Sequence, residues 1–140
     1  MYQIVLDTNV LVSALRSKNG ASHRLLSLLG DDRWRPNLTV AVVLEYEAVL
    51  KRECADFGLT EQDIDEVLDA ICSQSGLHRV YFLWRPAASD PDDDLILEAA
   101  VASHSELIVT FNARDFADAG RFGIRCLTPK EFLILIKELP

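Results

Sequence analysis

Short apolar runs alternate with segments of helical periodicity along the chain. The apolar runs, rich in β-branched residues and typical of strands in a parallel sheet, lie at 3–6, 79–83, 107–109 and 124–127. Between them, apolar residues recur at helical spacing, and the clearest stripe consists of Ile64, Val67, Leu68 and Ile71. Strands that alternate with helices predict an α/β fold in which a parallel sheet carries helices on both faces.

Several predicted helices have recognisable ends. Thr60 and Thr128 each stand three residues before an acid, a capping-box pattern that begins a helix. Gly76 is expected to end the helix that Thr60 begins, because glycine is common just past a helix C-terminus. Ser22 is expected to cap a further short helix. Residues 38–42 fit either a strand or the entry to the next helix, and the sequence leaves that choice open.

Length and composition limit the class of protein. The chain has 140 residues, 49% of them hydrophobic, so we expect one domain over residues 1–140 with a sizeable core. No apolar run reaches the ~18 residues of a membrane span, and the N-terminus has no signal-peptide pattern. These features favour a cytoplasmic protein that does not contact a membrane. The 3 cysteines are widely spaced and predict neither a disulfide framework nor a zinc site.

The formal net charge of −8 argues against a nucleic-acid-binding protein that relies on a broad basic surface. Part of the excess lies in acidic clusters that bound cations would offset, and an acidic surface also suits a basic protein partner. The densest positive stretch consists of Arg16, Lys18, Arg24, Arg33 and Arg35. These side chains are expected to form a solvated face; the alternative is that they steer RNA phosphates toward the acids.

Acidic residues recur where predicted strands stop and helices begin. They are Asp7, Glu45, the run at 90–94 and Asp115. Because ligands of open α/β sheets bind at the carboxyl ends of the strands, we expect these acids to meet at one edge. Carboxylates gathered there repel each other without a cation, and Mg²⁺ prefers oxygen ligands. The pattern predicts a Mg²⁺ or Mn²⁺ site suited to phosphoryl chemistry.

Each acid also has a purely structural interpretation. Asp7 can cap a helix, although a carboxylate directly after a buried strand is costly unless it is paired or liganded. Glu45 can lie on a solvated helix face. The run at 90–94 can be a well-capped helix start, and Asp115 can belong to a turn. Only the combination of these acids favours a shared site.

Three segments, in this order along the chain, resemble PIN-domain proteins. They are residues 4–13 (IVLDTNVLVS), residues 90–94 (DPDDD) followed by 97–100 (LEAA), and residues 108–116 (IVTFNARDF). The resemblance covers nearly the whole chain, and the subgroup it resembles is the toxin component of prokaryotic toxin–antitoxin pairs, similar to VapC toxins. It implies a three-layer α/β/α sandwich around a central parallel sheet, and a Mg²⁺- or Mn²⁺-dependent endoribonuclease.

The resemblance also implies roles for single residues. Asp7 would be the first metal ligand and Glu45 the second. The third acid falls at Asp94 when it is counted back from the strand that ends at Val109. It falls at Asp93 when the Asp-Pro-x-Asp pattern of the subgroup is followed. We favour Asp94 and keep both as catalytic candidates.

One position departs from the family pattern. Asn112 stands where many members carry an aspartate, and an amide is a weaker, neutral ligand. Asp115 then becomes the better fourth carboxylate, as in relatives with an Asn-x-x-Asp-Phe ending. The resemblance further implies that residues near the acids orient ligands or waters. These residues are Thr8, Asn9, Asp90, Thr110 and Asn112.

The toxin subgroup implies an RNA substrate, a small antitoxin partner and a homodimer. The acids would hold metals that activate water for in-line attack on an RNA phosphodiester, without a side-chain nucleophile. Two alternatives stay open. One is a PIN-like interaction module that has lost catalysis, for which Asn112 is the only sequence support. The other is a Mg²⁺-dependent phosphotransferase that phosphorylates Asp7, although the chain lacks the second aspartate of a DxD phosphatase opening.

Overall fold

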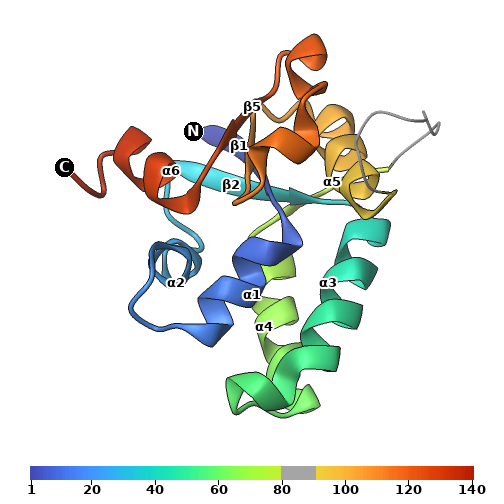
Figure 1. Ribbon diagram of the computed structural model, residues 1–140, viewed down its shortest axis with the longest axis vertical. Coiled ribbons are helices and arrows are strands. Elements are labelled where there is room, and N and C mark those ends of the chain that lie inside the picture. The colour runs from blue at the N-terminus through green and yellow to red at the C-terminus, as the bar shows by residue number, and fades with distance from the viewer. Residues whose placement is uncertain (80–90) are drawn as a thin grey trace.

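The computed structural model describes residues 1–79 and 91–140, and in residues 91–93 the backbone alone (Figure 1). Helices and strands alternate along the chain. In order they are β1 (Tyr2–Leu6), α1 (Thr8–Arg16), α2 (Ala21–Ser27), β2 (Trp34–Leu38), α3 (Val40–Glu53), η1 (Cys54–Phe57), α4 (Glu61–Ser73), β3 (Gly76–Leu77), α5 (Pro91–Ala102), β4 (Leu107–Val109), η2 (Ala113–Phe116), η3 (Ala119–Phe122), β5 (Arg125–Leu127) and α6 (Pro129–Leu135), where η marks a 3-10 helix.

In the described part of the chain the sheet has five strands in the order β3-β2-β1-β4-β5, and every neighbouring pair is parallel. The central strand is β1, in which Ile4 pairs with Pro36 on one side and with Leu107 on the other. The chain first builds the sheet outward from β1 to β2 and β3, and then crosses over to β4 and β5. The direction of winding therefore changes between β1 and β4, where open α/β sheets bind their ligands.

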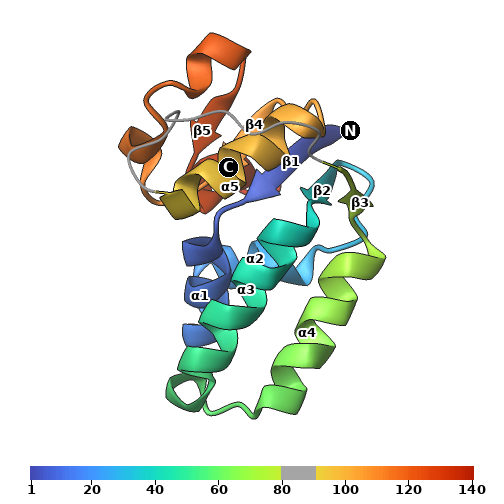
Figure 2. The same ribbon diagram turned by 90° about the vertical axis from the view of Figure 1, so that its right-hand side faces the viewer.

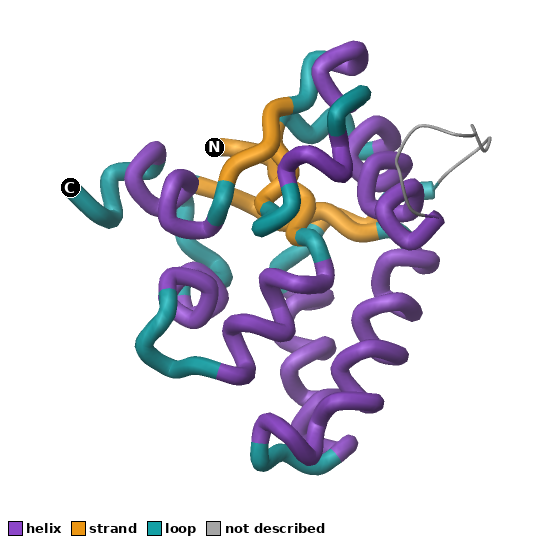
Figure 3. Tube along the Cα trace, in the orientation of Figure 1, coloured by secondary structure: helices purple, strands orange, loops and turns teal. Residues whose placement is uncertain are grey.

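Helices cover both faces of the sheet, which confirms the predicted α/β/α sandwich (Figures 1 and 3). On one face, α5 packs against β1, β2 and β4. On the opposite face, Phe132 of α6 makes edge contacts with Tyr2 and Trp34, at ring-centroid distances of 6.2 and 6.0 Å. Helices α3 and α4 form an antiparallel hairpin that extends away from the sheet (Figure 2), and α3 also packs against α1 and α5.

The central strands are apolar because both of their faces are covered. Ile4, Val5 and Leu6 of β1 are buried, as is the whole of β4, and these side chains belong to one continuous core. The capping boxes predicted at Thr60 and Thr128 are both present. Within the described part of the chain, no helix is long and apolar enough to cross a membrane.

Three boundaries differ from those expected from sequence. Ser22 does not cap α2; Gly20 does, and the Ser22 hydroxyl is buried inside the helix without a hydrogen-bond partner among the described residues. Gly76 begins β3, and α4 ends before it. Strand β2 ends at Leu38 and α3 starts at Val40, which resolves the ambiguity at 38–42. Of the strand expected at 79–83, Arg79 is irregular and the other residues lie outside the described ranges.

Candidate active site at the carboxyl edge of the sheet

Asp7 lies directly after β1 and is the N-cap residue of α1. Its backbone N–H donates to the carbonyl oxygen of Val109 at the end of β4 (2.9 Å), and its own carbonyl accepts from Val10 N–H (3.0 Å). Its side chain does not make the usual capping hydrogen bond to the second or third residue of α1, and the residue is only 6% exposed. The backbone thus holds the Asp7 carboxylate, largely removed from water, at the point where the sheet changes its direction of winding.

Thr110 fixes that carboxylate from the neighbouring strand. Its hydroxyl donates to Asp7 Oδ2 (2.7 Å) and accepts from the backbone N–H of Asn112 (3.0 Å). The residue is fully buried, and its N–H donates to the carbonyl oxygen of Leu127 at the end of β5 (2.8 Å). Since the Thr110 hydroxyl has only one proton, accepting from Asn112 leaves that proton for Asp7.

The surroundings of Asp7 raise the pKa of its carboxyl group above the ordinary value. Burial is the largest cause, and the negative charge of Asp115 adds to it, while hydrogen bonds from Thr110 and from the backbone of Thr8 act in the opposite direction. Burial, together with the negative charge of Asp7, also raises the pKa of the Cys126 thiol to about 11. A site that disfavours its own negative charge in this way favours a bound cation.

The other predicted acids lie on elements that meet around this edge. Glu45 is half-buried on α3, which packs against α5, and Asp115 is half-buried in η2, which also packs against α5. Asp94, near the start of α5, is 3% exposed. Asp90 and the side chain of Asp93 lie outside the described residues, so the choice between Asp93 and Asp94 stays a prediction.

Two residues near these acids were not singled out as site residues by the sequence analysis. Glu98 lies one helical turn after Asp94 and is equally buried, at 3% exposure; the spacing of four within α5 is the signal that could have found it. Tyr46, next to Glu45 on α3, donates its hydroxyl proton to the carbonyl oxygen of Leu6. Tyr46 therefore ties α3 to the last residue of β1, directly before Asp7.

The described residues fit a hard divalent cation through oxygen donors. Among them, no three histidine, cysteine or acidic side chains gather closely enough to form a metal cluster. Mg²⁺, however, commonly uses one or two carboxylates together with water and phosphate. Asp7 and Asp115 are close enough for one charge to raise the pKa of the other, and Asn9 Oδ1 is buried with no partner among the described residues. Two carboxylates and an unused amide oxygen suit Mg²⁺ or Mn²⁺.

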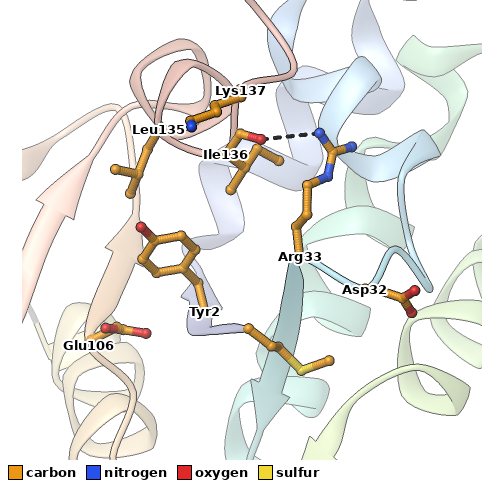
Figure 4. Close-up of a pocket in the computed structure, with 8 residues that line it drawn as sticks. Tyr2, Asp32, Arg33, Glu106, Leu135, Ile136 and Lys137 are labelled. Atoms are coloured by element: carbon orange, nitrogen blue, oxygen red, sulfur yellow. Dashed lines mark hydrogen bonds between the residues drawn. The ribbon is translucent and has the colours of Figure 1, made fainter.

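A hollow lies at the opposite, amino edge of the sheet (Figure 4). It encloses about 650 Å³, and its lining includes Tyr2, Arg33, Glu106 and Lys137. The Arg33 guanidinium is already engaged: it donates to the carbonyl oxygen of Ile136 (3.1 Å) and pairs with two carboxylates. Because its most prominent charge is already paired, we place the candidate active site at the carboxyl edge.

Comparisons with known proteins identify the family and the fold. A family model described as "PIN domain" matches residues 3–114. The fold is similar to that of VapBC2 from Rickettsia felis bound to a DNA fragment from its promoter, with a TM-score of 0.62 and 16% identity over 90% of this chain and 98% of that chain. It is also similar to VapBC-1 from nontypeable Haemophilus influenzae, with a TM-score of 0.60 and 14% identity over 91% of this chain and 98% of that chain. No curated protein matched the sequence.

Proposed function

The chain belongs to the PIN domain family, and we propose that it is a divalent-metal-dependent endoribonuclease that serves as the toxin of a toxin–antitoxin pair. The observation that supports the proposal best is the Asp7 carboxylate, which is buried, hydrogen-bonded by Thr110 and raised in pKa at the carboxyl edge. A perturbed acid at the switch point of an α/β sheet is typical of a functional site. The likeness to two VapBC structures supports the toxin assignment.

In this proposal the acids bind the cation and the polar neighbours orient the acids. Asp7, Glu45, Asp94 and Asp115 are the proposed ligands, with Asp93 as the alternative to Asp94. A bound Mg²⁺ or Mn²⁺ would activate water and offset the charge that builds up on the phosphate. Thr110 keeps Asp7 Oδ2 in place through its hydroxyl. Thr8, Asn9, Asp90 and Asn112 are proposed to orient ligands or water.

The proposal includes a protein partner. We infer a small antitoxin partner, because the two structures compared above are named as VapBC proteins. We also propose, as the family resemblance implies, that the toxin is a homodimer acting in the cytoplasm. The surface offers apolar contacts for such partners: Val40 and Leu44, one turn apart on α3, are 63% and 58% exposed. Apolar side chains that share one face of a helix are a common part of protein interfaces.

RNA cleavage tests the proposal directly. Purified protein is incubated with structured and single-stranded RNAs in Mg²⁺, in Mn²⁺ and in EDTA, beside Asp7→Asn and the matched control Asp31→Asn. We expect metal-dependent cutting by the parent protein and by Asp31→Asn, and none by Asp7→Asn. Full activity in Asp7→Asn would refute the site. If calorimetry shows no metal binding and no RNA is cut, the chain is an interaction module; a trapped acyl-phosphate on Asp7 would indicate a phosphotransferase.

A further inference from the structure

A basic hollow lies between the loop that joins α1 to α2 and the start of α6. It encloses about 450 Å³, and its lining includes Lys18, His23, Arg24 and Lys130. None of the described residues that line it is acidic. The chain has a formal net charge of −8, but this hollow is lined by three formally positive side chains, a lining that suits an anion.

Two of these charges are available to a ligand. Arg24 is partly offset, because its guanidinium pairs with Glu138 Oε2 at 2.6 Å. Lys18 and Lys130 are exposed and have no carboxylate within ion-pair distance in the described part of the chain. Asn19 and Ser27 also line the hollow, although the Ser27 hydroxyl already donates to the carbonyl oxygen of Arg24 (2.6 Å). Lysine ammonium groups of this kind bind phosphate as point charges.

The residues of the basic stretch described in the sequence have different surroundings in the structure. Arg16 pairs with Glu53 (2.9 Å), and Arg33 pairs with both Asp31 and Glu138. Their charges stabilise contacts between elements of the fold. Lys18 lies in the loop after α1 and lines the hollow together with Lys130, which is distant in sequence.

The position of the hollow connects it to the acidic edge. Helix α1 begins next to Asp7 and runs for nine residues, about 13 Å, before the loop that carries Lys18. Lys130 is the second residue of α6, which follows β5 directly. The last residue of β5, Leu127, accepts a hydrogen bond from Thr110, the residue that holds Asp7. The hollow thus lies within a few nucleotides' reach of Asp7.

We propose that this basic hollow binds phosphate groups of the substrate RNA on one side of the bond to be cut. The inference rests on the proposed ribonuclease function. It adds the place where the RNA strand leaves the acidic edge. Because Lys18 and Lys130 contact phosphates and no bases, they strengthen binding to every sequence about equally. Selection of a particular RNA then comes from other parts of the surface.

The test measures binding without cleavage. A short fluorescent single-stranded RNA is titrated with the full chain in EDTA over a series of salt concentrations, with Lys18→Glu/Lys130→Glu beside Arg125→Glu. Arg125 is exposed at the start of β5, at the edge away from Asp7, so its reversal shows how much one reversed charge outside the hollow changes the affinity. We expect the double variant to lose affinity about tenfold, and its slope of log affinity against log salt to fall by about 1.4, which is ~0.7 for each lost phosphate contact. The Arg125 variant should stay within about twofold.

The outcomes separate this inference from the function on which it rests. The proposed phosphate site is overturned if the double variant binds RNA as tightly as the parent. It is also overturned if the double variant and Arg125→Glu lose affinity equally, even if the protein cuts RNA. Binding of inorganic phosphate to the parent and the double variant is measured alongside. If the double variant loses phosphate binding while its RNA affinity is unchanged, the proposal is overturned and the ligand is a small anion. A selective loss of RNA affinity supports the hollow even if no cleavage is found. Lys18→Gln/Lys130→Gln, with folding checked by circular dichroism, replaces the reversal variant if that one unfolds.

Discussion

Asp7 and Asp31 lie near opposite edges of the sheet, and their carboxylates have opposite surroundings. Asp7, at the carboxyl edge, is buried, receives its side-chain hydrogen bond from a neutral hydroxyl, and lies near another negative charge, so its pKa is raised. Asp31, at the amino edge, accepts from the side chain and the backbone of Arg33 at 2.8 Å, and these bonds lower its pKa to about 2. Arg33 also pairs with Glu138.

This difference separates a structural acid from a functional one. The Arg33 network satisfies its own charges, so Asp31 needs no further ligand. Asp7 keeps a carboxylate in a place that disfavours the charged form, and the neutral Thr110 hydroxyl only partly compensates. Such an arrangement lowers the stability of the metal-free protein and is retained where a ligand supplies the missing positive charge. The predictions below test this contrast.

The largest effect is expected for Asp7→Asn. Cleavage should fall at least about a hundredfold, because the charge that holds the cation is lost. Stability in EDTA should rise at neutral pH. The raised pKa of Asp7 means that its charged form is penalised in the folded protein, so the penalty is absent below the unfolded pKa and complete above the folded one. Thermal unfolding of both proteins at pH 4 and pH 7 checks this: the difference should grow with pH, and a less stable variant at pH 7 would contradict it.

Thr110→Val should have the next largest effect. The variant removes the donor to Asp7 Oδ2 and the acceptor for Asn112 N–H inside a fully buried environment, at a cost of about 1–3 kcal/mol. Because the Thr110 hydrogen bond lowers the pKa of Asp7, its loss should move the acidic limb of the pH–rate profile to higher pH. We expect activity at neutral pH to fall about tenfold. Thr110→Ser keeps the hydroxyl, so its acidic limb should lie at the pH of the parent protein. If Thr110→Ser is shifted as far as Thr110→Val, the hydrogen bond is not the cause of the shift.

Asp31→Asn should change stability with the opposite dependence on pH and leave cleavage unchanged. Because the pKa of Asp31 is lowered to about 2, its contribution to stability is present above its unfolded value near 4 and is lost as the pH falls toward 2. The loss of thermal stability at pH 7 should be small, because the pair is partly exposed to solvent. Unfolding curves between pH 2 and pH 7 test the sign: parent and variant should converge at the acidic end.

The fold could be predicted well where local signals and tertiary packing agree. Strands β1 and β4 are apolar because they are central, and the capping box at Thr60 has both of its hydrogen bonds, 2.8 and 3.1 Å, to Asp63. The extent of strand β2 (Trp34–Leu38) was not predicted, because proline and asparagine, here Pro36 and Asn37, are uncommon inside strands. In the structure the Asn37 amide is buried and donates to Gln3 Oε1 at 3.0 Å. That partner, distant in sequence, is what makes a polar residue acceptable in a strand.

The role of Gly76 also could not be predicted from the sequence. The sequence suggested a helix end, where glycine is common, but the residue begins β3. A Cβ atom at this position would lie 2.6 Å from Asn37 Oδ1 and 2.9 Å from His78 Nε2, so close approach of neighbouring groups requires the glycine. Such a reason depends on contacts that only the folded chain contains.

The site was predictable to the extent that it follows the strands. Asp7 and Thr110 each come directly after an apolar strand, and adjacent parallel strands bring their ends together. That Lys18 and Lys130 line the same hollow was not predictable, because it depends on the packing of α2 against α6. The burial of Glu98 beside Asp94 likewise becomes visible only once α5 is seen to lie against the sheet.

A modest effect is expected for Tyr46→Phe, which tests whether α3 helps to position the end of β1. The buried hydroxyl donates to Leu6 O, so its removal should lower stability by about 1 kcal/mol. Cleavage should change less than about threefold, because the hydrogen bond from Asp7 N–H to Val109 O still holds the backbone beside the acid. Tyr2→Phe, on the face of the sheet that contacts α6, is the matched control, and the two are compared by denaturant unfolding and by kcat. If Tyr46→Phe reduced cleavage as much as Thr110→Val, the position of Asp7 would depend on α3 as strongly as on β4, and the contrast with Asp31 would have to include the whole α3 helix.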